Sequence, residues 1–322
     1  MHIRIGRALL AATAAGATVA TMGLAAAGSA AAATTAHRGH QPFSGGTPVY
    51  TAPCSGDAGF TSNAAPVTFG AGGCAGYVGS HRNFRYAQAI IRLPQTNVIN
   101  PATSLATSEA APTLYVGLTS ADAMAAAGFM TCANFRIQFG VPGSGPCAGG
   151  GAPLIWVGVG WTLLNNGASV SATAIGLSGV SPGDGVQFQV YYPEGGAAHF
   201  TITPPVGSVT SFQLPSSGTF NAVFNHADAL VDYSASTPEL APGPASTVDL
   251  RITQFQKGGW TTVGGTKGTF SGTGGKWTLN PAVLTSNGTA PPGGTIQVEP
   301  ATLWNDGLGL GAGDAFGVWW RH

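Results

Sequence analysis

Two short strings in this sequence come close to patterns that carry known chemistry, and neither is complete. The first, Gly179-Val180-Ser181-Pro182-Gly183, fits Gly-x-Ser-x-Gly, in which a nucleophilic serine sits on the turn between a strand and a helix. Here a proline follows the serine, and a Gly-Asp-Gly turn leads into another β-like run. These residues favour a turn between two strands, so Ser181 is not expected to be a nucleophile.

The second string is His37-x-x-His40, which has the spacing of a metal chelate but no third ligand nearby. Farther along, His226 and Asp228 are two residues apart in a β-like run. Their side chains should share one face of a strand, where they could form an acid–base pair. The sequence contains no phosphate-binding loop, no dinucleotide fingerprint and no His-Glu-x-x-His string. We therefore expect no metal and no cofactor.

The four cysteines are an even set: Cys54, Cys74, Cys132 and Cys147. In a secreted chain such a set predicts two disulfides, with three possible connectivities. We expect neighbours to pair, Cys54 with Cys74 and Cys132 with Cys147. Zinc binding is the alternative, but the sequence has no Cys-x-x-Cys spacing and no histidines cluster near the cysteines.

The composition excludes several classes of protein. Charged residues make up 7 % of the chain, against about 25 % in an ordinary soluble domain. Helical bundles and coiled coils use dense charged surfaces, so a mostly helical protein is not expected. The 12 basic and 12 acidic residues leave no basic surface for a nucleic acid. The 44 % of hydrophobic residues suffices for a core, so the chain is not disordered throughout.

The amino terminus has the pattern of a signal peptide, which we place at residues 1–33. Arg4 and Arg7 precede an uncharged, Ala-rich run, and small residues follow at 28–33. The run is rich in Ala, Gly and Thr rather than Leu, Ile and Val, so it would be a poor membrane span. We expect a secreted, extracellular protein with no membrane association after the signal is removed.

The remainder divides into a predicted flexible leader, residues 34–65, and one domain, residues 66–322. The domain contains many short β-like runs separated by Gly, Pro, Asn and Ser, which favours an all-β sandwich or barrel. The one helix-like segment is the Ala-rich stretch 120–128. The clearest β-like runs are residues 87–93, 113–118, 134–141, 186–192, 199–203, 248–255 and 315–320.

Two of these segments alternate in a way that bears on function. In residues 134–139, Asn134, Arg136 and Gln138 would share one face of a strand. In residues 227–232, Asp228 and Asp232 would lie on the face opposite Ala229 and Val231. The simplest interpretation of both polar faces is a surface in contact with solvent.

The aromatic residues allow a binding role. Seven Trp and seven Tyr in a charge-poor β protein suit a face on which flat rings stack against sugars, although most such rings pack in the core or at its rim. Trp319 and Trp320 would place one ring on each face of the last strand.

Taken in order, several segments resemble the glutamic peptidases, the eqolisin family. The clearest is Cys132-x5-Gln138-x-Gly140-Val141, closed by Cys147, which is similar to the disulfide loop around that family's catalytic Gln. Residues 227–232, Ala-Asp-Ala-Leu-Val-Asp, resemble the family's Ala-Glu-Trp-Ile-Val-Glu, which holds its catalytic Glu. The resemblance runs from about residue 70 to the end through short motifs. Further matching positions are Tyr77 in Gly-Tyr-Val-Gly, 91–94, Tyr115 in Leu-Tyr-Val-Gly-Leu, Trp156, Trp161 and 181–184.

The resemblance implies a fold and a site. The fold would be a two-sheet antiparallel, jelly-roll-like (concanavalin-like) sandwich, and the activity that of a secreted acid endopeptidase. Asp228 would act as general base on the attacking water, and Gln138 would stabilise the oxyanion. Asp228 stands where the family has Glu, so its carboxylate would be drawn back by about 1 Å. Implied substrate-binding residues are Tyr77, Tyr115, Trp156 and Trp161.

The sequence thus supports two hypotheses of different classes. The first is an eqolisin-like acid endopeptidase with a carboxylate/Gln dyad and a polypeptide substrate. The second is a catalytically impaired sandwich that binds peptide or polysaccharide through an aromatic-lined face. In both we expect a monomer without nucleic acid, metal or cofactor.

Overall fold

The structure is a computed structural model that describes eleven segments, all within the unit His40–His322. The predicted signal peptide, Cys54, the His37/His40 string and all but residues 49–51 of the predicted leader lie outside them. The described residues are 49–51, 73–94, 112–120, 123–149, 155–164, 171–217, 221–232, 250–285, 291–293, 296–307 and 311–320.

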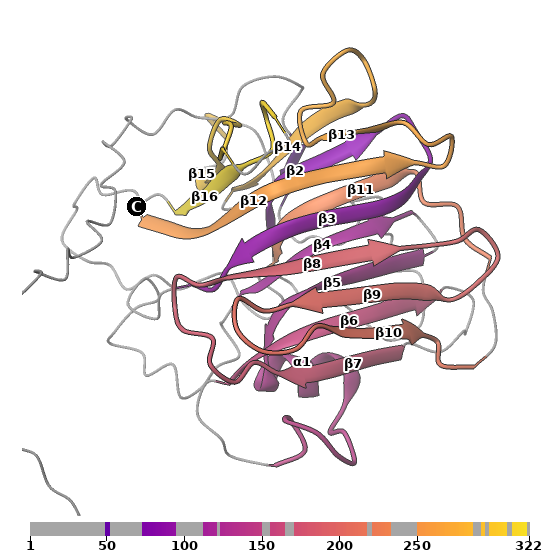
Figure 1. Ribbon diagram of the computed structural model, residues 1–322. Coiled ribbons are helices and arrows are strands. Elements are labelled where there is room, and N and C mark those ends of the chain that lie inside the picture. The colour runs from indigo at the N-terminus through magenta and orange to yellow at the C-terminus, as the bar shows by residue number, and fades with distance from the viewer. Residues whose placement is uncertain are drawn as a thin grey trace, which may run out of the picture. The chain divides into compact units, whose positions relative to one another are not determined.

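Strands dominate these segments and join into one large sheet that is antiparallel apart from one short pair (Figure 1). The sheet has two arms joined where β15 pairs with β16. The first arm holds, in spatial order, β10 (Thr210–Leu214), β9 (Ala198–Thr203), β8 (Gly185–Tyr191), β3 (Phe84–Arg92), β12 (Leu250–Thr262) and β16 (Phe316–Trp320).

The second arm continues the same hydrogen-bonded order. Two short strands lie off this path: β1 (Val49–Thr51) pairs in parallel with β14, and β13 (Lys267–Thr269) pairs with β12. The second arm holds β15 (Ile296–Pro300), β14 (Thr278–Thr285), β2 (Cys74–Ser80), β11 (His226–Asp232), β4 (Thr113–Thr119), β5 (Ala123–Thr131), β6 (Trp156–Leu164) and β7 (Ser171–Gly176).

The two arms face each other across the main hydrophobic core. Strand β3 contacts β4 and β11, and β5 contacts β8 and β9. Figure 1 shows β3, β8, β9 and β10 lying in front of the strands of the second arm. Alternation explains the packing, because in β8 Val186, Phe188 and Val190 are buried while Gln187 and Gln189 are only half-buried on the opposite face.

The all-β, antiparallel prediction is confirmed at this level. The finer prediction, a two-sheet jelly-roll sandwich, is not confirmed. The strand order runs through β16 and β15 without a break, so the strands form one sheet that is nearly closed into a barrel. The sequence pattern had left sandwich and barrel open, because short alternating strands are common to both.

The middle of the second arm is buried on both of its faces. Every residue of β2, β4 and β5 is buried, and a second hydrophobic cluster lies on the face turned away from the main core. Small residues allow its strands to pack closely. A Cβ atom on Gly128 would lie 1.8 Å from the Leu114 carbonyl oxygen, so only glycine fits there.

Two local predictions were wrong. Residues 120–128, predicted as helix-like, instead lie largely in β5, between β4 and β6. Residues 134–141, predicted as a strand, lie largely in helix α1 (Cys132–Phe139). The Thr131 hydroxyl accepts a hydrogen bond from the Asn134 N–H at 3.2 Å, and Gly140, with φ of 80°, ends the helix. These caps prevail over the apparent alternation.

The predicted pairing of Cys132 with Cys147 is confirmed. Cys132 and Cys147 form a disulfide with an S–S distance of 2.06 Å, which ties the start of α1 to the loop after it. Cys74 is also disulfide-bonded, while its expected partner, Cys54, lies outside the described residues.

Candidate functional site

Asp228, the predicted general base, lies in the middle of β11 on the face of the second arm turned away from the main core. Its side chain is fully buried, with 0 % of its surface exposed. The Thr119 hydroxyl of β4 donates a hydrogen bond of 2.7 Å to Oδ2. Oδ1 is buried without a hydrogen-bond partner among the described residues. The solvent-facing interpretation of this polar face is therefore wrong for Asp228.

Burial changes the acid–base behaviour of this face. Loss of solvation raises the pKa of Asp228 to about 8, although the hydrogen bond from Thr119 opposes the shift. Asp232, four residues along β11, is also buried, and desolvation raises its pKa to about 7. The pKa of Tyr115, between them on β4, is raised by burial and by the two carboxyl groups. Asp228 is therefore a neutral acid at acidic and neutral pH, whereas a general base must be ionised.

Gln138, the other member of the predicted dyad, lies near the end of α1 rather than on a strand. The helix contacts β5 and β7, and β4 lies between β5 and the β11 strand that carries Asp228. The side chain of Gln138 lies outside the described part of the structure. A contact between Gln138 and Asp228 thus stays a prediction.

The four predicted substrate-binding aromatic residues have the contacts of core residues. Tyr77 is fully buried and donates a 3.0 Å hydrogen bond to the Ala301 carbonyl. Tyr115 and Trp161 are buried and pack edge to face, with ring centroids 5.6 Å apart. Trp156 is half-buried against Phe129. These contacts give no support to a substrate-binding role, because three of the four rings are covered by protein.

The turn interpretation of Ser181 fits the structure. The residue lies in the connection between β7 and β8, where the Asp184 carboxylate accepts a hydrogen bond of 2.8 Å from the Ser181 N–H. The Asp184 N–H in turn donates to the Ser181 carbonyl oxygen. No helix follows the serine, so the arrangement lacks what a nucleophile elbow requires.

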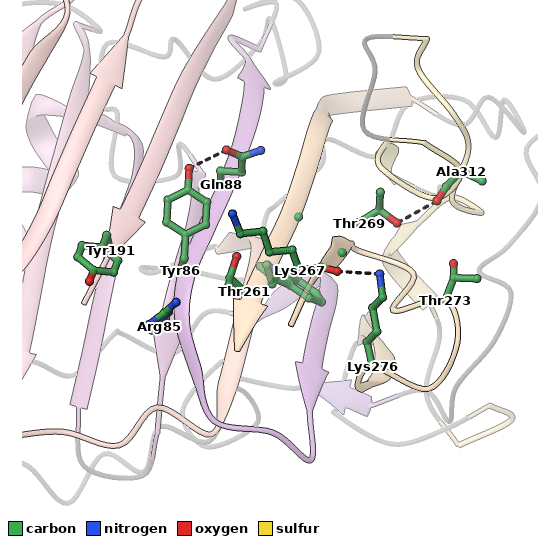
Figure 2. Close-up of a pocket in the computed structure, with 13 residues that line it drawn as sticks. Arg85, Tyr86, Gln88, Tyr191, Thr261, Lys267, Thr269, Thr273, Lys276 and Ala312 are labelled. Atoms are coloured by element: carbon green, nitrogen blue, oxygen red, sulfur yellow. Dashed lines mark hydrogen bonds between the residues drawn. The ribbon is translucent and has the colours of Figure 1, made fainter. Parts of the chain in front are cut away.

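A groove that the sequence motifs did not identify lies on the outer face of the first arm, and we call it the tyrosine groove. It has a volume of about 810 Å³. Figure 2 shows Arg85, Tyr86 and Gln88 along one strand, β3, with Tyr191 of β8 beside them. The lining residues are Arg85, Tyr86, Gln88, Tyr191, Gly259, Trp260, Thr261, Lys267, Gly268, Thr269, Thr273, Lys276 and Ala312.

Hydrogen bonds hold several groups of the groove in place. The Tyr86 hydroxyl donates to Gln88 Oε1 at 2.7 Å, and the Lys276 ammonium donates to the Lys267 carbonyl at 2.7 Å (Figure 2). Burial raises the pKa of Tyr86 to about 12, so its hydroxyl remains a donor across the physiological range. Tyr191 is 39 % exposed, which leaves part of its ring accessible to a ligand.

A row of polar side chains continues from the groove across the first arm. In register, Gln88 of β3 lies opposite Gln189 of β8, Gln189 opposite Thr201 of β9, and Thr201 opposite Ser211 of β10. Gln189 Nε2 donates to Gln88 Oε1 at 3.5 Å, and the Thr201 and Ser211 hydroxyls are 3.2 Å apart. Of this row, only the polar face of β8 could have been found in the sequence, from the spacing of Gln187, Gln189 and Tyr191 in one β-like run.

A second pocket, the histidine pocket, lies at one end of β2, β11 and β14 and has a volume of about 630 Å³. It brings together His81 and His226, which are far apart in the sequence, while His199 lies on β9 of the first arm. The lining residues are Val78, Ser80, His81, Arg82, Asn83, Asn225, His226 and Asn280.

Within the described segments, no three or more His, Cys, Asp or Glu side chains gather in a way that could hold a metal ion. Nor does this part of the chain contain a helix of the length and apolarity needed to cross a membrane.

Comparison with known proteins gives a likeness at the level of the fold. A crystal structure of scytalido-glutamic peptidase with a peptide-based transition-state analogue is 15 % identical, covering 60 % of this chain and 81 % of its own, with a TM-score of 0.35. A second crystal structure of the same peptidase, with a transition-state analogue inhibitor, is 16 % identical. The match covers 60 % of this chain and 82 % of the peptidase chain, with a TM-score of 0.35. SCP-B, a member of the eqolisin family in complex with the tripeptide Ala-Ile-His, is 12 % identical. The match covers 76 % of this chain and 96 % of SCP-B, with a TM-score of 0.33.

These TM-scores are too low to assign a family or an activity to this chain. No protein-family model matches the sequence, and no curated protein matches it either. The two pockets and the buried carboxyl groups are therefore the features that bear on function.

Proposed function

We propose that this protein binds an anionic polysaccharide along the outer face of the first arm, with the tyrosine groove as the centre of the site. The observation that carries this proposal is the lining of the groove. It combines Tyr86 and Tyr191 with three cationic residues, Arg85, Lys267 and Lys276, and with no carboxylate. Aromatic rings and fixed polar groups in a concave site are typical of ligand binding, and the cations favour a negatively charged ligand.

The position of the groove on a sheet face favours a polysaccharide over a peptide. Peptides that extend a sheet do so at its edge, where main-chain N–H and C=O groups are free. In β3 and β8 these groups already pair with neighbouring strands on both sides. A ligand on this face must be recognised by side chains, and the row of Gln, Thr and Ser side chains offers donors and acceptors suited to sugar hydroxyl groups.

The proposal includes secretion as a monomer. The Cys132–Cys147 disulfide supports export, since disulfides form and persist mainly in oxidising compartments. The Ala-rich stretch at residues 1–33 would be the export signal.

Titration calorimetry with polygalacturonate, and with dextran as the neutral counterpart, tests the binding proposal. We expect binding to polygalacturonate only, weakened about tenfold by Tyr191→Ala and by Lys267→Gln. Arg136→Gln removes a cation from α1, outside the groove, and should leave the affinity unchanged. Equal binding to both polymers, or no binding to either, would reject the proposal.

Peptide-bond hydrolysis remains a second candidate because Asp228 is a buried carboxyl with a strongly raised pKa and an unpartnered oxygen within the described structure. Such groups are enriched at active sites. In this candidate Asp228 transfers the protons and Gln138 stabilises the oxyanion, as the eqolisin resemblance implies. Because Asp228 ionises only near pH 8 in its closed surroundings, acid activity would require substrate binding to expose it.

Digestion of an unfolded protein substrate from about pH 2 to about pH 9 separates the two functions. The binding proposal expects no cleavage at any pH. Cleavage that is lost in both Asp228→Asn and Gln138→Ala would establish the dyad instead, provided that both variants keep the disulfide and unfold cooperatively.

A further inference from the structure

The histidine pocket has the lining of an anion site and lies on elements other than those that form the outer face of the first arm. Its polar residues come from the end of β2 and the turn after it, from β11 with the residue before it, and from β14. Its lining includes one cation, Arg82, two imidazoles and three side-chain amides, and none of its residues is acidic. The positive charge of Arg82 opposes a metal cation and favours an anion.

Several donors in the pocket are held in position. Asn280 Nδ2 donates to the Ser80 hydroxyl at 3.0 Å, and the same hydroxyl lies 3.0 Å from His81 Nδ1. Arg82 donates through Nε to the Lys276 carbonyl at 2.9 Å. That bond fixes the guanidinium and leaves its terminal nitrogens without a hydrogen-bond partner among the described residues, as a bidentate contact to a carboxylate requires.

The Nδ1 atom of His226 is a buried polar atom. It makes no hydrogen bond within the described segments. An unpaired buried polar atom is costly, and a ligand that pairs with it recovers that cost. Burial and the nearby His81 lower the pKa of His226, so an anion beside the two rings would relieve both effects.

The backbone at His81 is also unusual. The residue has φ of 62°, in the left-handed region that non-glycine residues rarely occupy. Such conformations are strained and are concentrated at binding and active sites. Here the left-handed turn brings His81 to the lining of the pocket, within hydrogen-bond distance of Ser80.

We propose that the histidine pocket binds a carboxylate, with the Arg82 guanidinium, the His226 and His81 rings and the Asn280 amide around it. The carboxylate could come from a uronic acid or from the free C-terminus of a peptide, and the test distinguishes the two. This site is independent of polymer binding in the tyrosine groove.

Protonation should strengthen the binding. The charged or titratable groups near the ligand are His81 and Arg82 in the turn after β2 and His226 and Asp228 on β11. Lys276 contributes its carbonyl through the bond to Arg82. The raised pKa of Asp228 keeps that carboxyl neutral below about pH 8, so it does not repel the ligand. We expect affinity to rise several-fold between about pH 7.5 and about pH 5 as the His226 imidazole gains a proton.

The experiment measures binding of four small probes by titration calorimetry: galacturonate, galactose, N-acetyl-dialanine and its C-terminal amide. We expect at least one acid to bind and its neutral counterpart not to bind. Galacturonate binding would identify a uronic acid as the source, and N-acetyl-dialanine binding a peptide terminus. The proposal would be overturned if neither acid bound, or if the acid and neutral forms bound equally well.

A pair of arginine variants tests the role of Arg82. Arg82→Gln should weaken carboxylate binding about tenfold, whereas Arg136→Gln, on α1 and in the lining of neither pocket, should not change it. Since Arg82 also bonds the Lys276 carbonyl, polygalacturonate binding is measured on the same variant and should be retained. His226→Gln should reduce the pH dependence. If this half-buried variant does not fold, the variant at exposed Arg82 still tests the proposal. Equal losses in the two arginine variants would also overturn the proposal.

Discussion

The outer faces of the two arms carry similar polar patterns but have opposite environments. On the first arm, Gln187, Gln189 and Tyr191 alternate with buried Val and Phe and are half-buried or exposed. On the second arm, Asp228 and Asp232 alternate with Ala229 and Val231, yet both faces are covered and both carboxyl groups are buried. A period of two identifies which residues share a face, but it does not reveal whether that face meets solvent.

The difference in environment determines the chemistry of each face. Amides and hydroxyls on an open face remain available to a ligand, and an exposed Tyr ring adds apolar area. Carboxyl groups on a covered face gain raised pKa values, because burial disfavours the charged form. The first arm is therefore suited to binding, whereas the second arm holds groups whose protonation is linked to folding.

The largest expected effect contrasts two aromatic residues, one from each arm. Trp161→Ala, on the covered face of the second arm, should lower the free energy of unfolding by about 3–5 kcal/mol, because it leaves a cavity beside Tyr115 and Met124. Tyr191→Ala, on the open face, should lower it by about 1 kcal/mol or less. Urea unfolding followed by fluorescence measures both. Similar losses would show that the two faces are not different in burial.

The next effect is the pH dependence of stability. Asp228 and Asp232 bind protons more tightly in the folded state than in the unfolded state, where their pKa is near 3.8. Between about pH 4 and about pH 8 the folded protein therefore holds more protons, and its stability falls as pH rises. Below pH 4 both states are protonated, and the contribution is fully present.

Replacing the Asp228 carboxyl with an amide should remove about half of this dependence, because Asp232 keeps its own share. Asp228→Asn keeps an acceptor for the Thr119 hydroxyl and has no charge to bury, so it should be more stable than the parent near pH 8 by a few kcal/mol. The two should be similar near pH 4. Asp184→Asn, in the exposed turn before β8, should retain the parental slope. Urea midpoints at several pH values test this, and parallel curves for Asp228→Asn and the parent would contradict it.

The sequence predicted the features that depend on local signals. Short alternating runs bounded by Gly and Pro predicted an all-β protein, and Pro182 with Gly183 predicted the turn before β8. The Cys132–Cys147 pair followed from neighbouring positions in the sequence. Each of these is decided by residues close together in the chain.

Features decided by distant residues were missed. The Ala-rich segment 120–128 looked helical, but its pairing with β4 and β6 makes it largely a strand, since tertiary packing outweighs weak propensities. The tyrosine groove joins Tyr86 of β3 with Tyr191 of β8 and Lys267 of β13, and no local pattern connects them. The burial of Asp228 likewise depends on what covers its face.

The smallest expected effect tests whether the polar row on the first arm serves binding or folding. Gln189→Ala removes a 3.5 Å hydrogen bond to Gln88 on a half-buried face, so the free energy of unfolding should change by less than about 0.5 kcal/mol. If the row contacts the polymer, affinity for polygalacturonate should fall about threefold to fivefold, as expected for one hydrogen bond. Urea unfolding and titration calorimetry on the same sample give both values. A clear loss of stability with unchanged affinity would make the row a structural element, and the binding site would then be confined to the tyrosine groove.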